Sequence, residues 1–311
     1  MRGLQSRHPL ADLRLHVDDF FPQIIAPTSA ELCEATLRLG ADAVVCFEQD
    51  LGLPFDAKKA QLTTTSPATA QTIASKMGTR CGTVAQHVIK LGIDATLQHK
   101  ARTAWSAVRR KRWRQIRSRT TRLHALKRAG AQRLGSIYTV GPVSAATYGV
   151  EVTGMPPSAL TTMRRQRLQF EGKLIQGARV DEQWLLEPLH ADPGLRPQFA
   201  PLHRYHREVW GCFVPPAAPP DNLTIPQLVS AFHIAQQRVQ TRRSAEAGPI
   251  GQAIVSARAV GWKFTSAFTL TDASSGLISL SEGSPEMLRQ MYAKAHRDFQ
   301  EALLCQRLQN K

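Results

Sequence analysis

The sequence has few features that would place the chain outside a cell or within a membrane. Its five cysteines are odd in number and widely spaced, and no CxxC motif occurs, so neither a disulfide framework nor a zinc ribbon is indicated. Free thiols favour a reducing compartment. No apolar run reaches the length that spans a bilayer, and the N-terminal segment lacks the apolar core of a signal peptide. We therefore expect an intracellular protein, nuclear if the host is eukaryotic.

Acidic residues are also scarce. Asp and Glu number 24 against 40 Lys and Arg, which gives a formal net charge of +16 and a pI of about 10.3. A protein this basic attracts polyanions. Nucleic acid is the commonest such partner, because its phosphates release counterions on binding. An anionic membrane surface is the competing partner that the charge alone leaves open.

Aromatic residues make up only 6% of the chain, but a hydrophobic content of 42% excludes a disordered protein. The 311 residues suffice for two domains or one large one. Common catalytic motifs are missing: there is no GxSxG elbow, and no Lys-Ser/Thr follows Gly248–Gly251 as a phosphate loop requires. His203 and His206 have helix-compatible metal spacing, but no ligand set is completed nearby, so we interpret them as surface histidines.

A β-hairpin is predicted at residues 13–25. Apolar and polar residues alternate from Leu13 onward, which is typical of a half-buried strand. Asp18 and Asp19 interrupt the alternation and a second apolar run follows, so the two acids are expected at a turn between strands. Pro22 would interrupt ladder pairing, which makes the second strand short or places it on a sheet edge.

Helices dominate the remaining prediction. Thr28 and Glu31 have capping-box spacing, which predicts a helix that runs to about Leu51. A loop and a short strand should follow it, and another short strand is expected around Val88–Ile93. The other predicted elements are helices within 66–98 and 142–176 and at Ile225–Gln240, a Pro-rich stiff linker at 215–220, a Gly-containing segment at 248–262, and a final helix that Ser284-Pro285 opens.

Residues 100–133 are the most distinctive stretch, with thirteen Lys or Arg and no Asp or Glu. Apolar residues recur there at helical spacing, which predicts an amphipathic helix with a buried stripe. The predicted stripe consists of Trp105, Val108, Ile116, Leu123 and Leu126. Trp113 lies at its border, so core packing and base stacking both stay open for that side chain. The expected nucleic-acid contacts are to phosphates, independent of sequence, through Arg109, Arg110, Lys111, Arg112, Arg114, Arg117, Arg122 and Arg128.

Four short blocks occur in order along the chain. The first, His16-Val17-Asp18-Asp19-Phe20, resembles the YxDD box of reverse transcriptases from non-LTR-type retrotransposons, in which two aspartates lie at the tip of a palm hairpin. Gly52–Lys59 resembles the GL-x-x-N-x-x-K block, with Asp56 at the Asn position. Lys90–Asp94 resembles the LG block of the primer-grip hairpin. Ala146–Gly149 resembles the YG near the end of the thumb, and residues 261–272 resemble a region downstream of the polymerase.

The resemblance implies an RNA-directed DNA polymerase. Asp18 and Asp19 would be its catalytic residues and its Mg²⁺ ligands, since two-metal nucleotidyl transfer clusters carboxylates at a rigid turn. Lys59 would lie near the phosphates of the incoming nucleotide. The basic helix would belong to the thumb that holds an RNA–DNA hybrid or duplex. An ordinary Asp-containing turn and a solvated surface lysine are the alternatives for these residues.

The sequence departs from the family in its catalytic part. The family needs a third acid on a separate strand upstream, and Asp12 is the only acid among the seventeen residues before Asp18. His16 replaces the usual Tyr, and the fingers are missing. We therefore expect a truncated enzyme, inactive alone, that would require another chain to supply the missing palm and fingers. A nucleic-acid-binding protein derived from such an element and a decayed open reading frame are the alternatives.

The expected fold class is α+β, with a partial palm formed by an antiparallel hairpin and helices. We assign residues 1–65 to this palm and 66–176 to a primer-grip-like segment and a mainly helical thumb. Residues 177–311 should form a mainly helical C-terminal region of unknown role. No membrane partner is expected.

Overall fold

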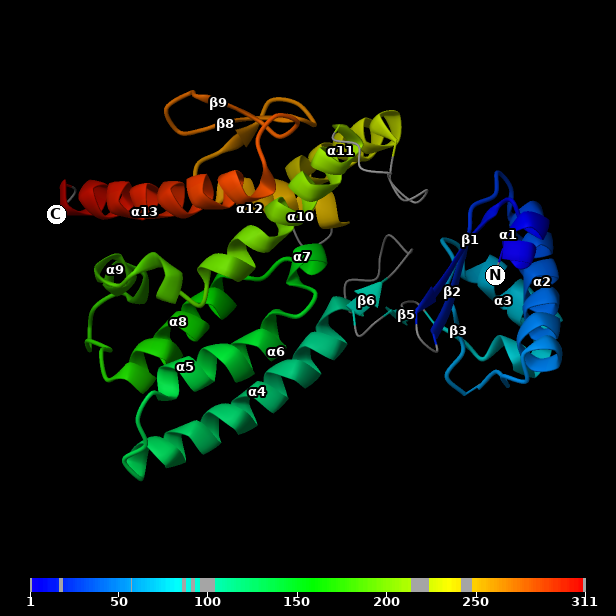
Figure 1. Ribbon diagram of the computed structural model, residues 1–311, viewed down its shortest axis with the longest axis horizontal. Coiled ribbons are helices and arrows are strands. Elements are labelled where there is room, and N and C mark those ends of the chain that lie inside the picture. The colour runs from blue at the N-terminus through cyan, green and yellow to red at the C-terminus, as the bar shows by residue number, and fades with distance from the viewer. Residues whose placement is uncertain are drawn as a thin grey trace. The chain divides into compact units, whose positions relative to one another are not determined.

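The computed structural model consists mostly of helices and has few, short strands, which is compatible with an α+β class (Figure 1). The chain divides into two compact units, Met1–Val108 and Arg109–Lys311, and each is described by itself. The predicted linker at 215–220 lies outside the described residues. The structure describes residues 2–16, 19–56, 58–85, 88–90, 93–95, 104–213, 224–241 and 248–309.

The first unit contains the predicted hairpin. Strand β1 (Ala11–His16) pairs antiparallel with β2 (Asp19–Ile24), in a register that runs from Ala11 opposite Ile24 to His16 opposite Asp19. The two residues that join the strands, Val17 and Asp18, lie outside the described residues. Because the sheet has two strands, Pro22 is in an edge strand, where a missing backbone N–H is tolerated. The hairpin prediction is confirmed.

Helices α1 (Arg2–Arg7) and α2 (Ser29–Val44) pack with this hairpin. Helix α2 continues as a π-helical turn, η1 (Val45–Asp50). Thr28 caps α2 as predicted, since its hydroxyl accepts a hydrogen bond from the backbone N–H of Glu31 at 3.2 Å. A small core joins these elements. It consists of Leu4, Ala11, Leu39, Ala43 and Phe47, with Leu13, Phe20 and Ile24 packed against it.

The rest of the first unit contains short elements. Strand β3 (Gln61–Leu62) pairs in parallel with β4 (Thr83–Val84), and between them lie α3 (Pro67–Met77) and the 3-10 turn η2 (Gly78–Cys81). The single strand expected around Val88–Ile93 is instead two: β5 (Val88–Lys90) pairs antiparallel with β6 (Ile93–Ala95). The connecting Leu91 and Gly92 lie outside the described residues.

The second unit begins with a helical layer around one core. Its elements are α4 (Ala104–Arg128, which starts in the first unit), α5 (Leu134–Tyr138), the π-helical turn η3 (Thr139–Val143), α6 (Ser144–Thr147), α7 (Val150–Thr153) and α8 (Pro157–Glu171). Helix α4 runs alongside α5 and α6 (Figure 1). The core that they share contains Ile116, Leu123, Leu134, Tyr138, Val143, Ala146, Leu160, Met163 and Phe170.

The C-terminal part combines helices with a three-stranded antiparallel sheet. The helices are α9 (Val180–Gln183), η4 (Trp184–Leu186), η5 (Leu189–Ala191), α10 (Leu195–Phe213), α11 (Ile225–Thr241), α12 (Gly248–Arg258) and α13 (Pro285–Gln309). The strands are β7 (Lys263–Phe264), β8 (Thr269–Thr271) and β9 (Leu277–Ser279). The segment predicted only as Gly-containing is therefore largely the helix α12, and the region after it is sheet.

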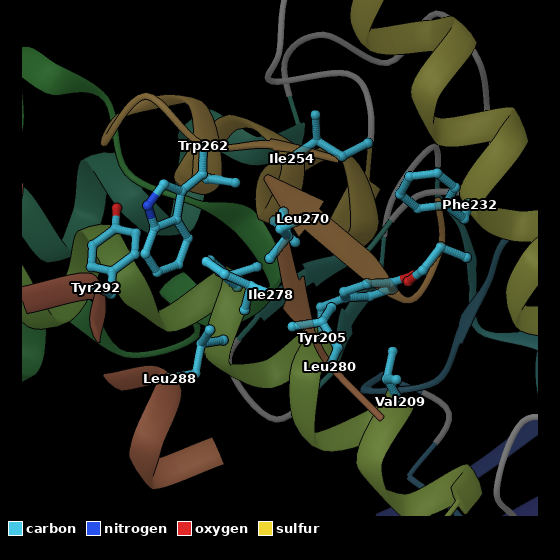
Figure 2. Packing of buried hydrophobic residues seen from close by; sticks show 14 of the residues in the cluster. Tyr205, Val209, Phe232, Ile254, Trp262, Leu270, Ile278, Leu280, Leu288 and Tyr292 are labelled. Carbon is cyan, nitrogen blue, oxygen red and sulfur yellow. The ribbon is translucent and has the colours of Figure 1, made fainter. Parts of the chain in front are cut away.

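This sheet covers the largest core of the chain. Figure 2 shows Leu270 and Ile278 of the sheet between Trp262 and Tyr292 on one side and Tyr205 on the other. The Trp262 and Tyr292 rings meet edge to face, with centroids 5.5 Å apart. As predicted, Ser284 starts α13, since its hydroxyl accepts from the backbone N–H of Met287 at 3.3 Å.

A buried charge network links α8 to α13. The Arg164 guanidinium donates Nε to Asp192 Oδ1 at 2.9 Å, Nη2 to Asp192 Oδ2 at 2.7 Å and Nη1 to Asp181 Oδ1 at 2.9 Å. Its Nη2 also lies 3.1 Å from Nε2 of His296. Because a guanidinium can only donate, His296 Nε2 is the acceptor, and the ring hydrogen is on Nδ1. Burial, with Arg164 as the second cause, lowers the pKa of His296 to about 4.

Lowering the pH should therefore destabilise the second unit. Unfolded His296 titrates near pH 6.5, whereas folded His296 has a pKa of about 4, so below pH 6.5 the unfolded state takes up a proton that the folded state does not. The free energy of unfolding should fall between pH 6.5 and about 4, by up to about 3 kcal/mol from this residue. Denaturant titrations across this pH range measure the effect.

The variant His296→Gln keeps an acceptor for Arg164 but does not titrate, so its pH dependence should be shallower than that of the wild type. Burial also lowers the pKa of His203 and His206, so the difference between the variant and the wild type isolates His296. The exposed His190 provides a control, since His190→Gln should follow the wild type. Superimposable curves for His296→Gln and the wild type would contradict the prediction.

Candidate nucleic-acid interface

The candidate interface is helix α4, in which ten residues are Lys or Arg and none is Asp or Glu. The described cations repel one another at helical spacing: Lys111 and Arg114, Arg114 and Arg117, and Arg119 and Arg122 are each three residues apart. Such like-charge pairs cost about 0.2–0.5 kcal/mol each. Local sequence therefore does not account for the stability of this helix, and packing of its other face must supply it.

The buried face of α4 differs in part from the predicted stripe. Ile116 and Leu123 are buried, as predicted, at 2% and 6% exposure, and the buried Thr120 lies between them. Trp113 is partly buried and packs against the same core. The prediction for Leu126 is wrong, since 48% of this side chain is exposed. The side chains of Trp105 and Val108 lie outside the described residues.

The buried face of α4 is rotated about the helix axis relative to the predicted stripe, and this rotation has a simple physical reason. The predicted stripe was centred on apolar residues alone, whereas the observed face includes the buried Thr120, whose hydroxyl has no hydrogen-bond partner among the described residues. On a helical wheel this turns the buried face by about 60° from the predicted one. Arg119 consequently lies on the solvent side, although by spacing it falls within the predicted apolar stripe. Arg119 was not among the contacts predicted from the sequence.

Six cations occupy the solvent half of α4. All six side chains are exposed, and within the part of the chain that the structure describes none of them forms an ion pair. At 1.5 Å per residue, the row extends for about 25 Å along the helix axis. Such a row can contact several successive phosphates without reading any base. The six residues are Lys111, Arg114, Arg117, Arg119, Arg122 and Arg128.

Two other cations of α4 bind the protein itself. The guanidinium carbon of Arg112 lies 4.8 Å from the ring centroid of Tyr148, and Nη1 of Arg112 donates to the Tyr148 carbonyl at 2.8 Å. The Lys127 ammonium donates to the carbonyl of Gln169. On the helical wheel Arg112 borders the buried face, whereas Lys127 continues the line of that face at the C-terminal end of the helix. The side chains of Arg109 and Arg110 lie outside the described residues.

The acidic hairpin and the Gly52–Lys59 block lie next to each other in the first unit. Phe20, which follows Asp19, lies 5.1 Å from Phe47 between ring centroids, and Phe47 lies 5.3 Å from Phe55. Phe20 and Phe55 are 6.4 Å apart. This aromatic trio packs the residue after one proposed site acid against the residue before Asp56. Asp18 and the side chain of Asp19 lie outside the described residues.

Lys59 is a surface lysine held at a turn. Its side chain is 86% exposed, and its ammonium lies 3.7 Å from a carboxylate oxygen of Asp56. Asp56 organises the turn, since its side chain accepts from the backbone N–H of Lys58 at 3.0 Å and its carbonyl accepts from that of Lys59 at 2.9 Å. An exposed ammonium can reach a phosphate, but here it already has a carboxylate partner.

The residues of the predicted Mg²⁺ site lie largely outside the described part of the chain. No group of three or more His, Cys, Asp or Glu that could hold a metal occurs among the residues with a described placement. The hairpin carries two adjacent aspartates, and nucleotidyl transfer requires a further carboxylate to hold both ions.

His206 corrects the interpretation of the two histidines as surface residues. It is fully buried in α10, with its ring 6.3 Å from that of Trp210, and burial lowers its pKa. The apolar residues around α10 bury it, which its spacing from His203 could not reveal.

Comparison of the chain with protein-family models, curated proteins and solved structures gives no match. Function must therefore follow from the residues themselves. In the described portion, no helix combines the length and apolar character needed to cross a bilayer.

A matched pair of substitutions tests the orientation of α4. Leu123→Ala removes a buried side chain and should lower the free energy of unfolding by about 2–5 kcal/mol. Leu126→Ala makes the same chemical change three residues later at a half-exposed position, and should cost well under about 1 kcal/mol. Urea denaturation of both variants measures the difference. Equal losses, or a larger loss for Leu126→Ala, would show that α4 packs through the stripe predicted from sequence.

Proposed function

We propose that the chain binds nucleic acid through the solvent half of α4, by sequence-independent contacts with phosphates. The observation that carries this proposal is the row of six exposed cations without ion-pair partners in the described structure. Solvated cations ordinarily occur among acidic residues, whereas α4 contains none. A helix that accumulates this much unbalanced charge despite its self-repulsion is suited to a polyanionic ligand.

The packing of α4 favours nucleic acid over an anionic membrane. A helix that lies on a membrane inserts an apolar face among the lipids, beneath its basic face. The apolar face of α4 is instead occupied by the protein, since Ile116 and Leu123 are in the core that also contains Met163 and Phe170. What remains for a ligand on the described part of α4 is chiefly a charged surface, with Leu126 as its large exposed apolar residue, and such a surface suits a phosphate backbone.

The more specific proposal is a fragment of a reverse transcriptase of the non-LTR type, with α4 in its thumb. The aromatic trio supports this, because it packs the acidic hairpin against the Gly52–Lys59 block, as a shared nucleotide site requires. The short antiparallel pair on either side of Leu91-Gly92 also matches a primer-grip-like hairpin. We further propose that this chain by itself binds nucleic acid and that polymerisation depends on another chain.

Binding to a labelled RNA–DNA hybrid should weaken steeply with salt, because each phosphate contact releases a counterion. Changing Lys111, Arg114, Arg117 and Arg122 together to Gln should lower the slope of log K against log salt by about 1 for each cation removed. Fluorescence anisotropy across a salt series measures both quantities.

A control variant separates position from net charge. Arg38, Arg80, Arg204 and Arg307 are exposed, and each pairs with a carboxylate, so changing all four to Gln removes the same total charge away from α4. This control should retain nearly the wild-type slope. Equal losses in the two variants would indicate attraction by net charge alone, and absence of binding at low salt would reject the proposed function.

Primer extension tests the catalytic part of the proposal. With Mg²⁺ and deoxynucleotides, the purified chain should bind a primed RNA template but not extend it, if its role by itself is binding. Asp18→Ala should leave binding unchanged. Extension by the wild type that disappears in Asp18→Ala would show instead that the chain is a complete polymerase.

A further inference from the structure

A large aromatic side chain lies at the edge of the basic row. Tyr148 is 54% exposed, although Ala146 and Val150 on either side of it are buried at 5% each. Gly149 turns the chain directly after it, with a φ of 73° that favours glycine. Buried neighbours and a tight turn fix the backbone at this position, so the ring is displayed by a rigid part of the fold.

Arg112 holds the ring in place from α4. Its guanidinium covers the ring at 4.8 Å and also donates to the carbonyl of Tyr148 at 2.8 Å. The two contacts constrain both the backbone and the ring of one residue. A ring that is fixed before binding loses less conformational entropy when a ligand stacks on it.

The pair of Arg112 and Tyr148 lies close to the phosphate-binding cations of α4, as a site that stacks a base of the same strand requires. Arg112 and Arg119 are seven residues apart on the same flank of α4, about 10.5 Å along its axis. Lys111, the residue before Arg112, lies near the middle of the solvent face on the helical wheel. A strand whose phosphates contact Lys111 and Arg119 would follow the part of α4 from which Arg112 reaches Tyr148. Aromatic stacking is the common way in which proteins hold unpaired bases, because every base has a π face.

We propose that Tyr148, held by Arg112, is a stacking platform for an unpaired base beside the basic row. The ligand class is then a hybrid or duplex with a single-stranded extension, rather than a blunt one. This inference rests on the proposed function, since the α4 cations bind the backbone that delivers the base. Stacking on Tyr148 would select ligands with a single-stranded extension over blunt ones, because bases inside a blunt duplex are already stacked on their neighbours. Phosphate contacts alone do not give this selectivity.

The test compares three probes with the wild-type chain at one salt concentration. One is a blunt RNA–DNA hybrid, one carries a three-nucleotide uridine overhang, and one carries an overhang of equal length made of abasic sites. The two overhangs have the same phosphates, so their affinities differ only through the bases. The uridine overhang should bind about tenfold more tightly than the abasic one, the effect expected for one stacked base.

Substitutions test whether the tighter binding of the uridine overhang is due to the side chain of Tyr148. Tyr148→Leu should abolish the difference between the overhangs, whereas Tyr148→Phe, which retains the ring, should keep it. Arg112→Lys retains the charge but not the planar guanidinium, and should reduce the difference part of the way. The melting temperature of each variant checks that the fold is intact.

The outcomes separate the two proposals. Equal binding of the uridine and abasic overhangs by the wild type overturns the stacking inference, and it leaves the proposed function standing if blunt binding still depends on salt and on the α4 cations. An overhang gain that persists in Tyr148→Leu also overturns it. Failure of all three probes to bind at low salt overturns both proposals.

Discussion

The buried guanidinium of Arg164 is the contact on which the arrangement of the second unit depends. It is 5% exposed, and it binds Asp192 through two nitrogens while it donates to His296 of α13. Helix α8 also supplies Met163 to the core beneath α4, and α13 supplies Tyr292 to the C-terminal core. Removal of one partner from such a buried pair typically costs about 3–5 kcal/mol. The network therefore adds a polar link between the two hydrophobic cores, beside the packing of α7 on α10 and α12.

The same fixed framework explains how α4 can carry its charge. The helix is stabilised by one face, where Trp113, Ile116, Thr120 and Leu123 pack on helices that Arg164 holds in place. Cations beside that face bind carbonyl groups of the protein, and cations away from it have no partner among the described residues. The proposed ligand-binding surface thus consists of the α4 positions that do not pack against the rest of the protein. Tyr148 lies at the boundary between the two sets, through its contact with a border arginine.

Local patterns predicted the local structure. The Thr28 cap, the β1–β2 hairpin, the start of α13 at Ser284-Pro285 and the basic helix itself each depend on residues a few positions apart. Features set by distant contacts were missed. Arg164 and His296 are 132 residues apart, so no spacing rule connects them. Strands of two or three residues, as in β7–β9, are too short to show an alternating pattern. Of the candidate interface, the cations were predicted, but the exposure of Arg119 was not, because a threonine helps to define the buried face.

The repulsion along α4 gives ionic strength two opposing effects on this protein. Dissolved salt screens the repeated like charges, so the folded helix should become more stable as salt is added. The same salt competes for the phosphate-binding cations and weakens attachment to a polyanion. The free chain is then least stable at low salt concentration, where its affinity for nucleic acid is highest. A bound nucleic acid would replace the missing counter-charge, so the ligand would contribute to the stability of the helix that recognises it.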